Sequence, residues 1–189
     1  MTYLNASPVQ NKAMRAGASV LVIPVLKATE WATAWERSPR SDMAVWRPLM
    51  PYRAGQRVGV RERLIKSEDG EAWLYASDNI PVWVDSANET AMIVWCHHMD
   101  AEVCAARSCP FWAIRTYLLI PSDPEVLRVQ DITLDTALEA LAKHWVWPEG
   151  ADPIDWYRDN VWTAQHGRKY PWEQNPFVWL YRGVKVERR

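Results

Sequence analysis

The chain has 189 residues, of which 49% are hydrophobic and 24% are charged, so it can bury a sizeable core and is neither disordered nor fibrous. No apolar run approaches the roughly 20 residues that cross a bilayer, and no signal peptide is visible, which argues against a membrane partner and predicts a cytoplasmic protein. The three cysteines are odd in number, and we expect them to be reduced thiols.

The net charge of −1 conceals an uneven distribution along the chain. Residues 1–66 hold 11 basic against 4 acidic side chains, residues 67–160 hold 5 against 17, and residues 161–189 hold 6 against 2. If the two basic ends meet in space, the molecule has a basic side and an acidic side. Such polarity favours a charged partner over a neutral metabolite, although charges of this kind also simply solvate a surface.

The N-terminal third begins with a helix and a strand. Ser7 followed by Pro8 is typical of a helix start and Gly17 of a helix stop, which predicts a helix over 8–16. The Val- and Leu-rich run 19–26 then predicts a strand. A helical pattern over 28–37 and a proline-containing extended connection over 38–56 complete this third.

The middle and the C-terminal part alternate short strands with two helices. Turn residues separate the predicted strands, which are 57–62, 71–76, 81–85, 91–96, 112–120, 125–130 and 177–186. Thr133 caps a helix over 134–145 that has one continuous apolar face. Asp152 and Pro153 start another helix, which ends near Gly167. Short strands with packed helices predict a mixed α+β fold.

Four stretches carry a resemblance to one family. They are YRAGQRVGVRE (52–62), CPFWAIR (109–115), VQDIT (129–133) and WEQNPFVW (172–179). In this order they resemble phage and prophage ASCH-domain proteins, which belong to the PUA-like superfamily. The resemblance implies a single domain over 1–189, built as a PUA-like (ASCH) mixed β-barrel with short helices packed at its ends. Residues 27–50 and 80–105 have no clear counterpart, and we interpret them as insertions that could carry function.

The family's catalytic motif is degenerate in this sequence. The family carries Gly-x-Lys-Thr-x-Thr-x-Arg near the N-terminus, and Lys, Thr and Glu are the proposed catalytic set in relatives that hydrolyse acetylated cytidine. Here Gly17 is kept, but Ser19 stands at the lysine position, Val20 and Val22 at the threonine positions, and Pro24 at the arginine position. Valine cannot replace a hydroxyl, and a serine without a nearby base is not a nucleophile.

The resemblance places four residues in the pocket of the family: Ser19, Glu62, Trp112 and Arg115. Glu62 matches the presumed acid, whereas Phe111 replaces a family arginine. Were the chain an enzyme, a nucleoside amidohydrolase, Glu62 would move protons and Arg115 would hold the substrate. The lost groups instead favour an abandoned active site and no catalytic residues.

A basic, aromatic segment offers a different kind of site. Its candidate partner or nucleic-acid contacts are Arg37, Arg40, Arg47, Arg53, Arg57, Arg61 and Arg63, with Trp35, Trp46 and Tyr52 interleaved. Arginine and aromatic side chains suit RNA and single-stranded DNA, because bases stack and guanidinium groups meet phosphate. The same residue types dominate protein–protein interfaces, so both readings stay open.

Cysteine and histidine do not make a convincing metal site. Cys96, His97 and His98 are adjacent, and Cys104 with Cys109 is the one pair whose spacing approaches that of zinc ligands. We therefore predict no metal and no cofactor.

Our first hypothesis is a non-catalytic, phage-encoded binding protein in the cytoplasm of a bacterial host. It engages a host protein or nucleoprotein complex, conceivably as an inhibitor of a CRISPR-type defence complex. Binding of RNA or single-stranded DNA is the alternative, and nucleoside hydrolysis comes last. A nuclease-controlled search for partners separates these hypotheses.

Overall fold

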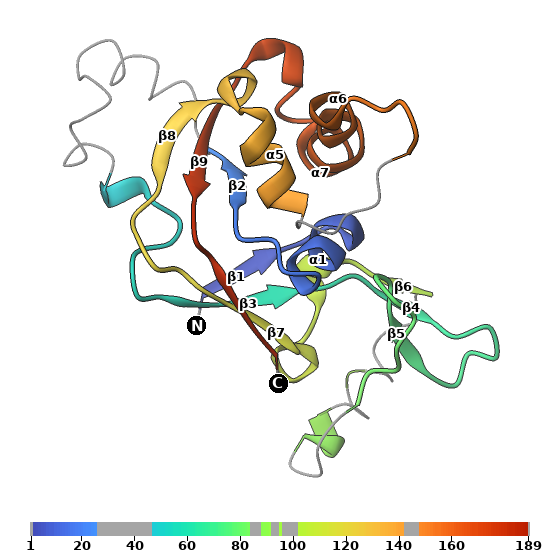
Figure 1. The fold of residues 1–189 in the computed structure, drawn as a ribbon. Helices are drawn as coiled ribbons and strands as arrows, with labels where there is room; N and C mark the ends of the chain where they lie inside the picture. The colour runs from blue at the N-terminus through green and yellow to red at the C-terminus, as the bar shows by residue number, and fades with distance from the viewer. Residues whose placement is uncertain are drawn as a thin grey trace.

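The computed structural model describes residues 2–25, 47–83, 88–91, 95, 102–141 and 148–188. Most of the predicted insertion 27–50 therefore lies outside the described residues, as do the candidate contacts Trp35, Arg37, Arg40 and Trp46. The described residues form an α+β domain with three small sheets and a few helices, so the predicted fold class is confirmed (Figure 1). None of the helices in these ranges has the length and apolarity that crossing a membrane requires.

Ten short strands make the three sheets. The first has the order β1 (Thr2–Asn5), β3 (Arg57–Arg61), β7 (Thr116–Leu119) and β10 (Lys185–Arg188). The second has the order β2 (Leu21–Pro24), β9 (Phe177–Tyr181) and β8 (Glu125–Arg128). The third, which lies to one side of the other two in Figure 1, has the order β5 (Trp73–Tyr75), β4 (Leu64–Lys66) and β6 (Val103–Cys104).

The described helices begin close to the predicted positions, and the predicted end of the helix over 134–145 lies outside the described residues. Helix α1 spans Pro8–Arg15, and Ser7 caps it by accepting a hydrogen bond from the Gln10 backbone. It stops at Gly17, whose φ of +102° turns the chain toward β2 and favours glycine. The later helices are α5 (Leu134–Leu141) and α6 (Pro153–Tyr157), the latter continuing through a wider turn (Arg158–Thr163) into α7 (Ala164–His166).

Three of the predicted strands need correction. The strand expected over 177–186 is two strands in different sheets, because Gly183 adopts a φ of +65° between β9 and β10. The strand expected over 112–120 starts only at Thr116, after a short helical turn over Phe111–Ala113. Residues 91 and 95 are the two described positions of the strand expected over 91–96, and both are helical.

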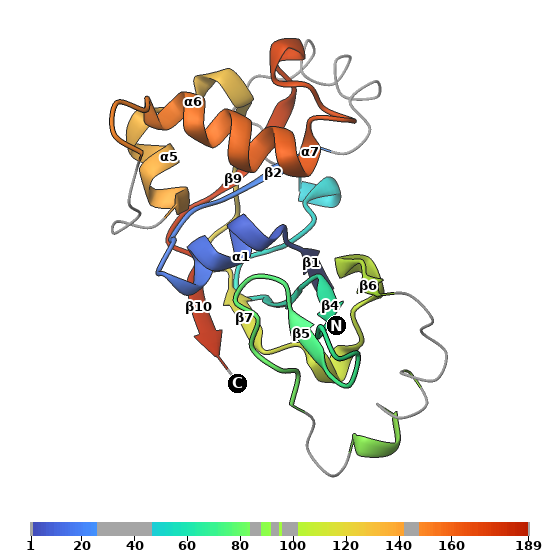
Figure 2. The ribbon, with the colours of Figure 1, turned by 90° about the vertical axis from the view of Figure 1, so that its right-hand side faces the viewer.

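Two links of only a few residues each join strands of the first two sheets directly. Strand β7 leads into β8 through the two prolines of 121–124, and β9 leads into β10 through Gly183. The first core cluster includes Leu4, Val58, Leu118 and Trp179, which come from both of these sheets. A second cluster, with Val22, Leu141 and Trp162, lies between β2–β9 and the helices that cover them (Figure 2).

The predicted closed β-barrel is not present in the described residues, which form three open sheets. Strands β1 and β2 are both sheet edges and do not pair with each other. The outward carbonyls of β1 bond side chains instead: the Tyr52 hydroxyl donates to the Tyr3 carbonyl at 3.0 Å, and the Gln165 amide donates to the Asn5 carbonyl at 3.1 Å. Side chains thus occupy the hydrogen-bonding positions that a neighbouring strand would use.

His166 ends the last helix against the aromatic part of the second core. Its ring lies 5.0 Å from the ring of Trp162, which is 1% exposed. Burial lowers the pKa of His166 from 6.5 to about 4, so the folded protein keeps this imidazole neutral at pH 7.

We expect this histidine to make the fold sensitive to mild acid. The pKa of His166 in the folded protein lies below the unfolded value of 6.5. The contribution of the neutral His166 to the free energy of unfolding is therefore complete above pH 6.5 and is lost as the pH falls toward 4. The free energy of unfolding should fall by roughly 1–3 kcal/mol across that window. Urea unfolding of the wild type and of His166→Gln at pH 7 and pH 4.5 measures it, and an equal acid loss in both proteins would contradict the assignment.

Candidate functional site

Glu62 follows strand β3 and points into the protein. Its side chain is 3% exposed, and its two carboxylate oxygens accept from Arg115, at 2.9 Å from Nε and 3.0 Å from Nη2. Arg115 precedes strand β7, which pairs with β3, so the sheet register brings the two residues together. This parallel, two-point contact is the strongest geometry of an arginine–carboxylate pair.

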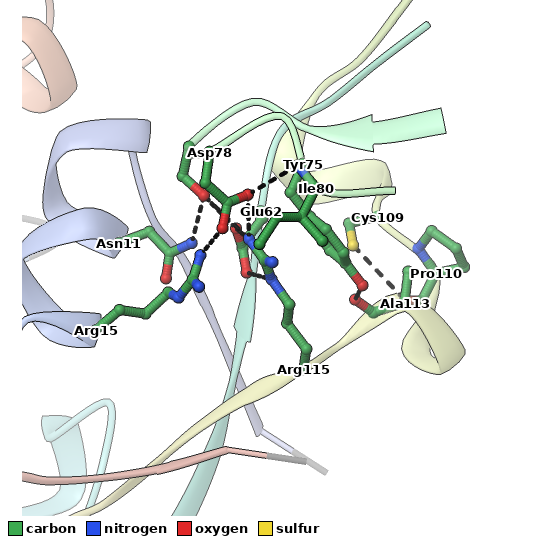
Figure 3. A network of polar contacts seen from close by, with 11 residues as sticks. Asn11, Arg15, Glu62, Tyr75, Asp78, Ile80, Cys109, Pro110, Ala113 and Arg115 are labelled. Atoms are coloured by element: carbon green, nitrogen blue, oxygen red, sulfur yellow. Dashed lines mark hydrogen bonds and ion pairs between the residues drawn. The ribbon is translucent and has the colours of Figure 1, made fainter. Parts of the chain in front are cut away.

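A turn and a helix complete the network around this pair. Arg115 Nη2 also donates to Ser77 Oγ at 3.1 Å and to Asp78 Oδ1 at 2.9 Å, and Ser77 Oγ donates to Glu62 at 2.9 Å. Arg15 of helix α1 forms an ion pair with Asp78 (Figure 3). The 77–78 turn therefore lies between α1 on one side and the Glu62–Arg115 pair on the other.

The charges in the network stabilise one another. Partial burial raises the pKa of Asp78, but hydrogen bonds from Arg115 and Arg15 outweigh it, so that the pKa lies below its usual value. Burial lowers the pKa of Arg115, but the hydrogen bonds to Glu62 and Asp78 raise it by more, so the pKa lies above its usual value. Arg115 also stacks 3.6 Å from the centre of the Tyr75 ring, whose hydroxyl donates to the Ala113 carbonyl.

This geometry does not suit Glu62 to act as a general base. Its oxygens already accept three hydrogen bonds, two from Arg115 and one from Ser77. The crevice beside it, between Ser7, Asn11 and Ser77, is too small for a water molecule. A general base needs a proton donor within hydrogen-bond reach, and no substrate can approach this carboxylate as it stands. Glu62 and Arg115 here form a structural ion pair.

The two other predicted pocket residues lie apart from that pair. Ser19 bonds through its backbone, donating to the Glu139 carbonyl and accepting from the Val184 amide. Trp112 is 5% exposed and meets Trp95 edge-on at 5.6 Å, within the core of the third sheet. The structure thus brings Glu62 and Arg115 into direct contact, whereas Ser19 precedes β2 and Trp112 packs in the core cluster that contains Tyr75, the ring on which Arg115 stacks.

Two of the predicted arginines lie on the outer face of the first sheet. Arg57 lies 3.9 Å from the centre of the Tyr117 ring, and Arg61 lies 4.0 Å from that of Tyr3. The register places Gly59 between the two tyrosines. We call these five residues the Arg–Tyr face. The tyrosines were not predicted as contacts. Only the pairing of the strands could have identified them, and that pairing cannot be read from the sequence.

The remaining predicted contacts are scattered. Arg47 is exposed and lies 3.3 Å from Asp123, and Arg53 and Arg63 are exposed as well. Tyr52 cannot stack on a base, because it is 5% exposed and bonds the Tyr3 carbonyl and Tyr181. The basic segment of the sequence is therefore not one continuous surface among the described residues.

The cysteines that the structure describes are buried in the third core. Cys104 and Cys109 are both free thiols, at 0% and 1% exposure. Burial raises the pKa of Cys109 to about 12, so this thiol is a poor nucleophile at neutral pH. Cys96, His97, His98 and His144 lie outside the described ranges.

We expect loss of Arg115 to destabilise the fold strongly. Arg115→Met would leave the Glu62 carboxylate buried without its cation, which typically costs about 3–5 kcal/mol. The exposed pair of Arg57 and Glu187, 2.8 Å apart, provides the control, and Arg57→Met should cost about 1 kcal/mol or less. Urea unfolding of both variants, and of Glu62→Gln combined with Arg115→Met, measures the difference. Equal losses in the two single variants would refute a stabilising role for the buried pair.

Comparison with known proteins adds no relative to this picture. No family model, curated protein or solved structure matches the chain. The resemblance to ASCH-domain proteins therefore rests on the four sequence motifs and stays a prediction.

Proposed function

We propose that this chain is a non-catalytic binding protein on a PUA-like scaffold, encoded by a phage or prophage, that engages a host macromolecule. The observation that carries the proposal is the state of Glu62. The residue at the family's acid position is paired with Arg115 and closed off from substrate. The positions of the family's lysine and threonines hold Ser19, Val20 and Val22, and both valines are buried at 4% exposure.

The surface that suits such a partner best is the Arg–Tyr face. Stacking on Tyr117 and Tyr3 holds Arg57 and Arg61 in place before any partner arrives, which lowers the entropy cost of binding. Arg57 is about half exposed, and its neighbour Lys185 in β10 is exposed too. Arginine and tyrosine are the residue types most often found at interface hot spots. The partner we propose is a negatively charged surface of a host defence complex, such as a CRISPR-type nucleoprotein.

We expect capture of a host protein by the purified chain from bacterial lysate, in a complex that survives nuclease treatment. Arg57→Gln combined with Arg61→Gln removes two positive charges from the Arg–Tyr face and should reduce recovery at least tenfold, since each hot-spot side chain typically contributes 1–2 kcal/mol. Mass spectrometry of the eluate, with stoichiometry from gel densitometry, measures the effect.

The matched control is Arg182→Gln. Arg182 is exposed and ion-paired with Glu125 of the second sheet, and it lies in the link between β9 and β10 rather than on the Arg–Tyr face. If both variants lose the partner equally, overall charge rather than the Arg–Tyr face governs binding. Turnover of an acetylated nucleoside that disappears in Glu62→Gln would overturn the non-catalytic proposal itself.

A second candidate function, direct binding of RNA or single-stranded DNA, is favoured by one detail of this face. The two arginine–tyrosine stacks lie on either side of Gly59, where an added Cβ would come within 3.1 Å of Tyr3 and 3.2 Å of Ile114. The two guanidinium groups of this kind suit phosphate, whereas Tyr117, at 8% exposure, cannot itself stack on a base. Glu187 pairs with Arg57 and so reduces the positive charge that this face offers to nucleic acid, and to an acidic protein surface equally.

If the second function holds, affinity for single-stranded RNA falls steeply with salt. Each phosphate contact contributes about 0.7 to the slope of log affinity against log salt concentration, so the double variant at Arg57 and Arg61 should lower that slope by about 1.4. Fluorescence anisotropy with a labelled oligonucleotide from 50 to 300 mM salt measures both slopes. Binding that does not respond to salt would remove this candidate.

A further inference from the structure

The third sheet has one face in its core and one face turned outward. Leu64 of β4 lies opposite Tyr75 of β5 and opposite Cys104 of β6, and all three side chains are buried in the third core. Successive side chains of a strand point to opposite faces of a sheet. The residues at the alternate positions therefore form the outer face of this sheet.

An apolar row of four residues crosses this outer face. Ile65 lies at its centre, opposite Leu74 on one side and Val103 on the other, and Leu74 forms a bridge with Pro81. The two ends of the row, Pro81 and Val103, are exposed, and the two residues between them are half-buried. Aligned apolar side chains on an outer sheet face are typical of an interaction surface, whereas single exposed ones are ordinary.

Trp83 extends the row at the edge of the sheet. The Val82 amide donates to the Trp73 carbonyl at 2.8 Å, and the Val82 side chain packs against the third core. The alternation of an extended chain then places Trp83 on the outer face together with Pro81. Trp83 is 81% exposed, and tryptophan is among the residue types most enriched at binding hot spots. We call Trp83 and the row together the outer apolar face.

A hollow of about 410 Å³ adjoins this face near the turn that joins β4 to β5. Two members of the row line it, and so do the exposed carboxylates Glu68, Asp69 and Glu102. Lys66 is the one cation among its described lining residues. None of the three carboxylates forms an ion pair with a residue that the structure describes. The described rim of the outer apolar face is therefore negatively charged.

The length of the row suits a helix. Neighbouring strands lie about 4.8 Å apart, so four residues across the sheet span about 14 Å, the length of roughly ten helical residues. A helix lying along the row would contact it with apolar side chains three and four positions apart, which form one stripe. Basic side chains beside that stripe would reach the carboxylates of the hollow.

We propose that the outer apolar face binds a basic amphipathic helix of a partner protein. The apolar stripe of the helix lies along the row and against Trp83, and its lysine or arginine side chains lie at the hollow. Charge selects this occupant over two others. The phosphates of a nucleic acid would meet the carboxylates, and a second copy of the chain would bring the same excess of carboxylates to the interface.

This surface is distinct from the Arg–Tyr face, which belongs to the first sheet and carries the opposite charge. It extends the proposed function by a second contact, made to a basic rather than an acidic part of a partner. The two are tested separately, because substitutions on the outer apolar face leave Arg57 and Arg61 unchanged.

Three labelled peptides of about 20 residues test the proposed chemistry, a length at which an isolated helix can form. The first has leucine along one helical face and lysine elsewhere. The second keeps the leucines and carries glutamate in place of lysine, and the third has the composition of the first with its leucines scattered around the helix. We expect the first to bind at least about tenfold more tightly than the others in fluorescence anisotropy. It should also shift the indole N–H resonance of Trp83 in the NMR spectrum of the ¹⁵N-labelled chain.

Matched variants locate the binding surface. Trp83→Ser combined with Val103→Ser should weaken the lysine peptide at least about tenfold, since it removes two exposed apolar contacts. Leu134→Ser is the control: Leu134 is 46% exposed, close to the 40% of Val103, but it lies at the start of α5. It should leave the affinity unchanged. Trp83→Ser alone serves if the double variant does not give the circular dichroism spectrum of the wild type.

The carboxylates have a test of their own. Glu68→Gln combined with Glu102→Gln should weaken the lysine peptide and reduce the dependence of its affinity on salt, because salt screens exposed charges.

Three outcomes would overturn the proposal. They are a lysine peptide that binds the Trp83 variants as tightly as the wild type, a glutamate peptide that binds equally well, and a wild-type dimer that dissociates in the Trp83 variants. Analytical ultracentrifugation detects the last of these, which would assign the outer apolar face to a second copy of the chain.

Discussion

The pairing of Glu62 with Arg115 holds the molecule together at the point where its parts meet. Glu62 follows β3, Arg115 precedes β7, and the 77–78 turn extends beyond β5 of the third sheet. Through Asp78 the same arginine is linked to Arg15 on helix α1. One guanidinium group thus connects two sheets and a helix, and its burial makes the connection expensive to break. A carboxylate committed to that task is not available for proton transfer.

The second constraint is the edge of β1. A barrel would require β1 and β2 to pair, but Tyr52 and Gln165 bond the outward carbonyls of β1. As a result, side chains protect the open edge of β1, and a cleft lies between β1 and β2 where a closed barrel would have paired strands. The open architecture and the cleft beside β1 therefore have the same physical origin.

Sequence reasoning succeeded where the signal is local. Ser7, Pro8 and Gly17 delimited α1, and Asp152 with Pro153 located the start of the helix that ends at His166, because caps act on backbone groups within a few residues. It failed at 177–186, where alternation continues through Gly183 and hides the bend. Of the two partners of Glu62, Arg115 was found from a motif, whereas Ser77, 15 positions further along, looked like an ordinary turn residue. Long-range pairs of this kind have no periodic signature.

The bend at Gly183 couples the two main sheets in a way that strand pairing alone does not. Strands β9 and β10 are one stretch of chain shared between the sheets, so the length of the three-residue link 182–184 sets which side of the first sheet each β10 side chain faces. One residue more or less in that link would turn Val186 toward solvent and Glu187 toward the core, away from Arg57. The length of this link therefore determines which β10 side chains form the outer surface of the first sheet.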